Sequence, residues 1–221
     1  IVAGRLLHRV PPRWIAAAGG LAFGAGYWIA SRSDGDFLLL LLGIGVVAGI
    51  GTGFCYVCPL TMCAKWFPRH KGLVTGIAVA GFGGGAVLLS YLGELFFARG
   101  MGVLSIFETV GLLYGAAILA AALPLHLPRG EAAGRPPIEF GLLTRDRYFW
   151  GLALGMFAGT FAGLLVIGNL KPMILSAGVA SSVATAAISA FAAGNAVGRI
   201  SWGWIADRRG AATIPLSLAF L

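Results

Sequence analysis

The sequence predicts an all-α membrane protein, and its composition is the first reason. Hydrophobic residues make up 58% of the chain and charged residues only 11%, whereas a soluble domain has about 25% charged residues. A chain with so few charges cannot cover itself with a polar surface, so we expect it to lie in a lipid bilayer. The net charge of +8 does not indicate a nucleic-acid partner, because the basic residues occupy short gaps between apolar runs.

The length of the apolar segments is the second reason. A helix needs about 20 mostly apolar residues to cross the hydrocarbon core. Six segments meet this rule and a seventh begins at residue 211; the six are 14–30, 37–64, 72–97, 102–125, 148–170 and 179–205. The second exceeds one span, so we expect its end, with Lys65 and Trp66, at the membrane interface. The chain starts within a motif and stops within a segment, so we expect an internal fragment of a longer protein.

The basic residues predict the orientation of these helices. All but four of the 16 Lys and Arg residues fall in loops that share one side if the segments alternate, namely 1–13, 65–71, 126–147 and 206–210. The four exceptions are Arg32, Arg99, Lys171 and Arg199. Because cytoplasmic loops carry the excess of positive charge, we expect a multi-pass protein of the cell's inner membrane with these loops in the cytoplasm.

The longest loop predicts a boundary between two halves. Residues 126–147 are rich in Pro and Arg, lack helical periodicity and contain a Pro pair, which stiffens the chain without hydrogen-bonding it. We expect residues 1–125 to form part of an N-terminal half, 126–147 to form a cytoplasmic linker, and 148–221 to form part of a C-terminal half.

A short motif repeats at the two ends of the chain. Gly4 is followed four residues later by His8 and then Arg9, and Gly203 is followed at the same spacing by Asp207 and Arg208. Two similar helical halves are a construction typical of secondary transporters.

Other motifs indicate helix packing more than chemistry. Cys55 and Cys58 form a C-x-x-C pair, but their neighbours are apolar and no further metal ligands accompany them. The glycine run at 81–85 lies in an apolar segment, not in the strand-turn-helix context of a phosphate loop. No catalytic triad, paired carboxylates or metal-ligand set falls on one side of the membrane. The sequence therefore predicts neither an enzyme nor a metal or cofactor site.

The stretch Gly203-x-x-x-Asp207-Arg208-x-Gly210 resembles the signature loop of the major facilitator superfamily, which lies between helices two and three and again between helices eight and nine. The seven segments would then be helices three to nine of twelve. Further stretches resemble the oxalate/formate antiporter family, bacterial relatives of the monocarboxylate transporters; they are 49–59, 65–72, 170–172 and 194–203.

This resemblance implies a major facilitator helical bundle that moves small organic anions, such as oxalate, formate or monocarboxylates, by alternating access. Antiport and proton symport both stay open, and a carboxylate-binding membrane sensor that does not transport is the alternative. The implied partners are the substrate anion and the bilayer, and the implied state is a monomer. The implied gating residues are Arg9, Gly203, Asp207, Arg208 and Gly210. The first copy departs from the family pattern with His8 in place of Asp, so a lock on that side is in doubt.

Arg199 is the main candidate for binding the substrate. It lies eight residues before Asp207, which places it roughly 12 Å into a core about 30 Å thick. An Arg at that depth costs about 2.5–3.5 kcal/mol, so it should face a polar cavity. Its guanidinium can bind a carboxylate through two parallel hydrogen bonds, and Asn195 lies one turn earlier on the same face. A structural ion pair is the other interpretation.

Tyr56 and Phe82 are weaker candidates for the same site. Aromatic residues in glycine-rich helices suit the wall of a small-anion cavity, and the cavity of the resembled family is aromatic. Both residues are equally suited to packing the core of a helical bundle, so the two interpretations stay open.

Overall fold

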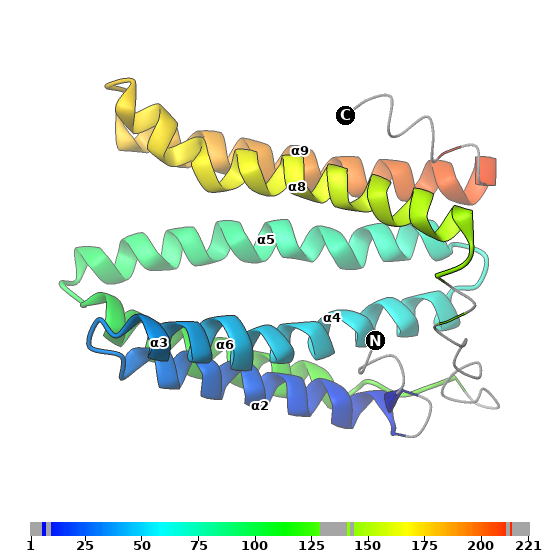
Figure 1. Ribbon diagram of the computed structural model, residues 1–221, viewed down its shortest axis with the longest axis horizontal. Coiled ribbons are helices and arrows are strands. Elements are labelled where there is room, and N and C mark those ends of the chain that lie inside the picture. The colour runs from blue at the N-terminus through cyan, green and yellow to red at the C-terminus, as the bar shows by residue number, and fades with distance from the viewer. Residues whose placement is uncertain (1–5, 8–9, 129–140, 142–143, 211–212, 214–221) are drawn as a thin grey trace. The chain divides into compact units, whose positions relative to one another are not determined.

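In the computed structural model, every regular element among the described residues is a helix, which confirms the predicted fold class (Figure 1). The described residues are 6–7, 10–128, 141, 144–210 and 213. The helices, in chain order, are α2 (Pro12–Ser31), α3 (Phe37–Leu40), η1 (Leu41–Ala48), α4 (Gly49–Trp66), α5 (Lys71–Ala98), α6 (Val103–Ala122), α8 (Arg147–Ser176) and α9 (Ser181–Arg209).

Each of the six predicted segments corresponds to a continuous helical stretch, and local signals explain several of the ends. The side chain of Asp36 accepts a hydrogen bond from the backbone N–H of Leu38 at 2.8 Å and caps α3. Asp146 caps α8 in the same way through Tyr148, at 2.9 Å. After α5, Gly100 adopts a φ of 75°, a left-handed conformation that glycine tolerates at helix ends. The predicted seventh segment lies outside the described residues except for Thr213.

Four helical stretches in the described part of the chain are long and apolar enough to cross a membrane: Phe37–Trp66, Val103–Ala122, Arg147–Leu170 and Val183–Arg209. Two parts of α5, Lys71–Gly81 and Val87–Ala98, are shorter apolar helices. Helix α2 has 20 residues, but its glycines and its Trp and Tyr residues lower its mean hydropathy. The chain is therefore a multi-pass membrane protein.

Contacts between residues divide the chain into two units. The first comprises residues 1–68 with 91–136, and the second comprises residues 69–90 with 137–221, so α5 contributes to both. The predicted boundary at 126–147 stays a prediction, and residues 129–140 and 142–143 of it lie outside the described part of the chain.

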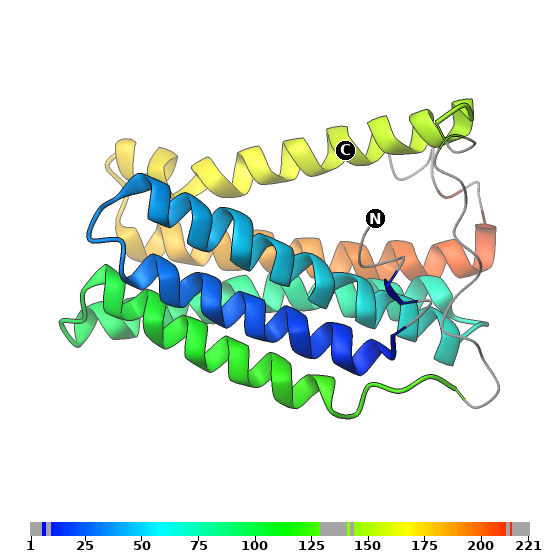
Figure 2. The same ribbon diagram turned by 60° about the horizontal axis from the view of Figure 1, so that its bottom comes forward.

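In the first unit, α2 lies between α6 and the long helix formed by α3, η1 and α4 (Figure 2). The backbones approach closely at glycines: Gly26 lies against Gly43 of η1, and Gly19 lies against Gly51 of α4, with no room for a Cβ atom at these positions. Such contacts are typical of helices packed in lipid, where small residues allow close approach.

Cys55 and Cys58 lie within this interface between α2 and α4. The thiol of Cys58 is fully buried and faces the carbonyl oxygen of Pro12 at 3.6 Å, and that of Cys55 faces the carbonyl oxygen of Ala16 at 3.7 Å. Both cysteines are free thiols. Their surroundings are those of packed side chains between two helices.

Candidate functional site

The candidate site of the second unit is built on one face of α9. Asn195, Arg199, Gly203 and Asp207 follow one another at intervals of four residues, and residues at this spacing lie above one another on a helix. The first part of α5 packs against this face. A Cβ atom on Gly72 would collide with the carbonyl oxygen of Gly203, and one on Gly76 would collide with that of Arg199. The two helices therefore run antiparallel with their backbones in contact.

Asp207 joins the end of α9 to the beginning of α5. Its Oδ1 accepts a hydrogen bond from the backbone N–H of Gly72 at 2.7 Å, and its Oδ2 accepts one from Leu73 at 2.8 Å. The first backbone N–H groups of a helix have no partner within the helix and attract negative charge. The first turn of α5 contains no acidic residue, so α9 provides the carboxylate that caps it.

The other residues predicted to act in gating lie around this cap. Arg208 does not pair with a carboxylate among the described residues; its guanidinium lies over the ring of Trp204, 3.8 Å from the ring centroid. Gly210 follows α9 with a φ of 61°, in the left-handed region that favours glycine. Arg9 and His8 lie outside the described residues. A gating role for any of these residues stays a prediction.

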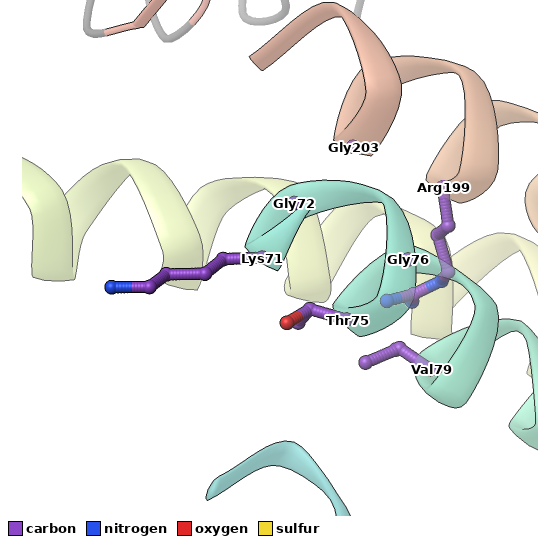
Figure 3. Close-up of a pocket in the computed structure, with 7 residues that line it drawn as sticks. All are labelled: Lys71, Gly72, Thr75, Gly76, Val79, Arg199 and Gly203. Atoms are coloured by element: carbon purple, nitrogen blue, oxygen red, sulfur yellow. The ribbon is translucent and has the colours of Figure 1, made fainter. Parts of the chain in front are cut away.

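A pocket of about 470 Å³ opens beside the contact between α5 and α9 (Figure 3). Its lining residues are Lys71, Gly72, Thr75, Gly76 and Val79 from α5 and Arg199 and Gly203 from α9. The lining contains two cations and a hydroxyl group and no acidic residue. Such a pocket is suited to an anion that carries some apolar surface.

Arg199 is held in this pocket by Asn195. Its Nε donates a hydrogen bond to Asn195 Oδ1 at 2.6 Å, and this neutral amide is its only polar partner among the described residues. Because Nε is engaged, the two terminal nitrogens of the guanidinium stay available for a ligand. The structure thus brings Arg199 and Asn195 together as the sequence spacing predicts, and it leaves the positive charge of the Arg unpaired within the described part of the chain.

The structure shows less about the two aromatic candidates for substrate binding. Phe82 lies in α5, in the second unit, and Tyr56 is a half-buried residue of α4, in the first unit. Their roles in substrate binding stay predictions. Sequence reasoning missed Lys71 and Thr75. Their spacing of four residues, on the segment whose Gly72 and Gly76 form a small-residue face, was the signal that could have identified them.

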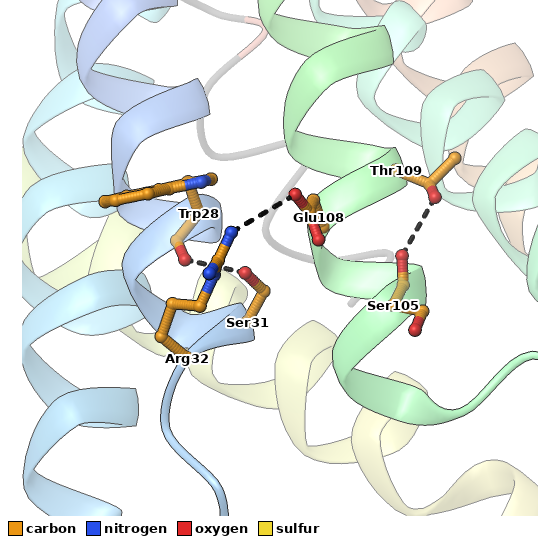
Figure 4. A network of polar contacts seen from close by, with 6 residues as sticks. All are labelled: Trp28, Ser31, Arg32, Ser105, Glu108 and Thr109. Atoms are coloured by element: carbon orange, nitrogen blue, oxygen red, sulfur yellow. Dashed lines mark hydrogen bonds and ion pairs between the residues drawn. The ribbon is translucent and has the colours of Figure 1, made fainter.

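A second polar cluster connects α2 and α6 in the first unit (Figure 4). Arg32 Nη2 lies 3.6 Å from Glu108 Oε1, and the Arg32 guanidinium lies 5.1 Å from the ring centroid of Trp28. Both charged side chains are partly exposed, and exposed ion pairs contribute little to stability. Contact between two helix ends accounts for the cluster. No group of three metal-ligating side chains occurs among the described residues.

Comparison with known proteins adds independent evidence on the family. The chain is 28% identical over 214 residues to the oxalate:formate antiporter of Oxalobacter formigenes, covering 94% of this chain and 50% of that protein. It is 27% identical over 223 residues to the uncharacterised MFS-type transporter YhjX of Escherichia coli, covering 94% and 53%. It is 29% identical over 234 residues to human monocarboxylate transporter 11, covering 99% and 47%.

The chain therefore spans about half the length of the curated relatives that it matches. The sequence pattern of one protein family matches residues 1–221, a range that includes the face of α9 with Arg199 and Asp207. With its helical architecture and this match over its whole length, the chain belongs to the Major Facilitator Superfamily.

Proposed function

We propose that the protein transports small organic anions, carboxylates such as oxalate, formate or a monocarboxylate, across the cell's inner membrane by alternating access. The observation that carries this proposal is the position of Arg199. Its guanidinium lines a pocket formed by α5 and α9, and its hydrogen-bonding partner is a neutral amide. A cation at this depth is costly unless it is compensated, and a bound carboxylate provides both the missing charge and two acceptor oxygens.

The names of two relatives support the substrate class. One is an oxalate:formate antiporter and the other a monocarboxylate transporter, so both names refer to small carboxylates. The excess of Lys and Arg in one set of loops supports an orientation with those loops in the cytoplasm. We expect the protein to act as a monomer in the bilayer.

The cap of α5 by Asp207 suggests how one conformation of the alternating-access cycle is stabilised. The two hydrogen bonds exist only while the end of α9 touches the beginning of α5. An interaction present in one state and absent in another shifts the population between the two states. We therefore assign Asp207 to the gate, with Gly72 and Gly203 as the residues that let the helices close upon each other.

We favour exchange of anions over proton symport as the mode of coupling. No acidic residue is among those that line the pocket, so the described lining offers no group that would take up a proton together with the substrate. During alternating access the pocket closes to water on both sides. If no anion is bound at that moment, the charge of Arg199 loses its hydration without gaining a counter-ion, which costs free energy. A carboxylate bound in each direction removes this cost.

The test is transport by the protein as the cell makes it, reconstituted into vesicles. Vesicles loaded with unlabelled carboxylate should take up labelled carboxylate faster than empty vesicles. An imposed pH gradient should not drive uptake into vesicles that contain no carboxylate. Uptake into empty vesicles driven by the pH gradient would show symport. Carboxylate binding without any flux would show that the protein is a sensor and would overturn the proposal of transport.

A further inference from the structure

We infer that Lys71 is the residue that captures the substrate anion from the cytoplasm, and that Thr75 contacts the anion on its way to Arg199. This inference rests on the proposed function, because it assumes that Arg199 binds a carboxylate. It goes further by assigning an entry path and two residues to one face of the transport site.

The first argument is position. Lys71 is the first residue of α5, and Lys71, Thr75 and Val79 line the same pocket as Arg199 at intervals of four residues. In Figure 3, Thr75 lies between Lys71 and Arg199, and the Lys71 side chain extends away from Arg199. Gly72 contacts Gly203, one turn from Arg199 on α9, so the two cations differ in depth by roughly 6 Å. They are placed to meet one small anion in succession.

The second argument is that no contact in the described part of the chain accounts for the charge of Lys71. A cation in the first turn of a helix opposes the helix dipole, so Lys71 does not favour the formation of α5. The nearby carboxylate of Asp207 is already bonded to the backbone N–H groups of Gly72 and Leu73. Lys71 forms no ion pair with any residue that the structure describes.

The tendency of cytoplasmic loops to be basic would also place a Lys at this position. The same tendency applies to Arg69, two residues earlier, which is exposed but does not line the pocket. Arg69 therefore serves as a matched control. A role in orienting the membrane protein predicts equal effects of the two residues, whereas capture of the anion predicts an effect of Lys71 alone.

The third argument concerns the hydroxyl group of Thr75. A Thr inside a helix commonly donates to the carbonyl four residues earlier, and Thr52, Thr61 and Thr109 do so here at 2.8–2.9 Å. Thr75 makes no hydrogen bond to any described residue through its side chain, although it lines the pocket. Its hydroxyl is therefore available to donate to an anion that Arg199 also holds.

The experiment measures carboxylate exchange separately from each face of the membrane, in inside-out and right-side-out vesicles. We expect Lys71→Gln to raise the KM for cytoplasmic carboxylate on the order of tenfold at low ionic strength, because a local charge accelerates the encounter with an anion. The effect should shrink as salt screens the charge, and Lys71→Arg should retain most of the activity. The external KM of Lys71→Gln and both KM values of Arg69→Gln should equal those of the parent.

Thr75→Val should weaken carboxylate binding several-fold, since it removes one hydrogen bond at nearly constant volume, and Thr75→Ser should restore it. Lys71→Met provides the same test of charge if Lys71→Gln folds poorly, as judged by elution from a sizing column. An equal rise of KM on both faces, a salt-independent effect, or an equal effect of Arg69→Gln would each overturn the capture role. If the parent exchanges carboxylates and Lys71→Gln matches it, only this inference fails; if the parent shows no exchange, the proposed function itself fails.

Discussion

Arg199 carries the functional proposal, so its replacement is the most informative perturbation. Arg199→Gln keeps a polar, hydrogen-bonding side chain, although a shorter one, and removes the charge. Arg199→Lys keeps the charge but loses the planar guanidinium geometry. Both variants leave Asn195, Gly203 and Asp207 in place on the same face of α9. The pair therefore separates the contribution of charge from that of geometry.

The size of the effect follows from the hydrogen bonds in the pocket. The Nε of Arg199 is engaged by Asn195 at 2.6 Å, which leaves the two terminal nitrogens for the two oxygens of a carboxylate. A hydrogen bond to a charged group contributes about 1.5–3 kcal/mol, and about 1.4 kcal/mol corresponds to a factor of ten in affinity. The amide of Gln can still donate to one carboxylate oxygen, so Arg199→Gln loses at least one of these charge-assisted bonds. It should therefore lose at least roughly ten- to a hundredfold in carboxylate affinity, and Arg199→Lys should lie between this variant and the parent.

The assay is binding or counterflow of labelled carboxylate with reconstituted protein, normalised to the amount of monodisperse protein. Asn195→Ala is the matched control, because it frees the Arg199 guanidinium without removing its charge and should cause a smaller loss. The reasoning is refuted if Arg199→Gln folds and binds carboxylate as tightly as the parent. Arg199 would then be structural, and the anion site would lie elsewhere in the protein.

Three further outcomes test the gate, the helix contact and the orientation. Asp207→Asn retains a weaker cap on α5, so it should slow exchange while expression stays normal. Exchange at the parental rate would contradict a gating role of Asp207. Gly203→Val places a side chain against the backbone of Gly72, and overpacking of this kind costs about 1–3 kcal/mol. Its melting temperature in detergent should fall, and an unchanged value would show that the close contact is not maintained. In a background without other cysteines, a cysteine at Asp34 should react with an impermeant reagent from outside and one at Arg69 from the cytoplasm; the reverse pattern would contradict the assignment from charge.

The helices could be predicted from the sequence because the bilayer imposes a simple rule of length and apolarity. All six segments from 14–30 to 179–205 have helical counterparts. The face of α9 that carries Asn195 and Arg199 could also be predicted from the sequence, because a spacing of four residues places side chains on one side of any α-helix.

The partner of that face could not be predicted from one sequence. Gly72 and Gly203 are far apart in the chain, and periodicity defines a face of each helix without saying which other helix covers it. The π-helical geometry of η1 was also missed. Its residues are ordinary apolar ones, and its geometry accompanies the backbone contact between Gly26 and Gly43, which no local pattern reveals.

The π-helical stretch η1 has a consequence for insertions and deletions. Gly43 lies against Gly26 of α2, and Gly51 lies against Gly19. The two glycines of the long helix are therefore eight positions apart in sequence, whereas their partners on α2 are seven positions apart. Deleting a residue from a regular α-helix rotates one end against the other by about 100° and turns packed side chains toward lipid. Deleting one residue between Gly43 and Gly51 would instead convert η1 to an α-helix and keep both glycine contacts, since a π-helical turn already holds the surplus residue. We therefore expect natural length variation among homologous chains to concentrate in this stretch of the membrane helix.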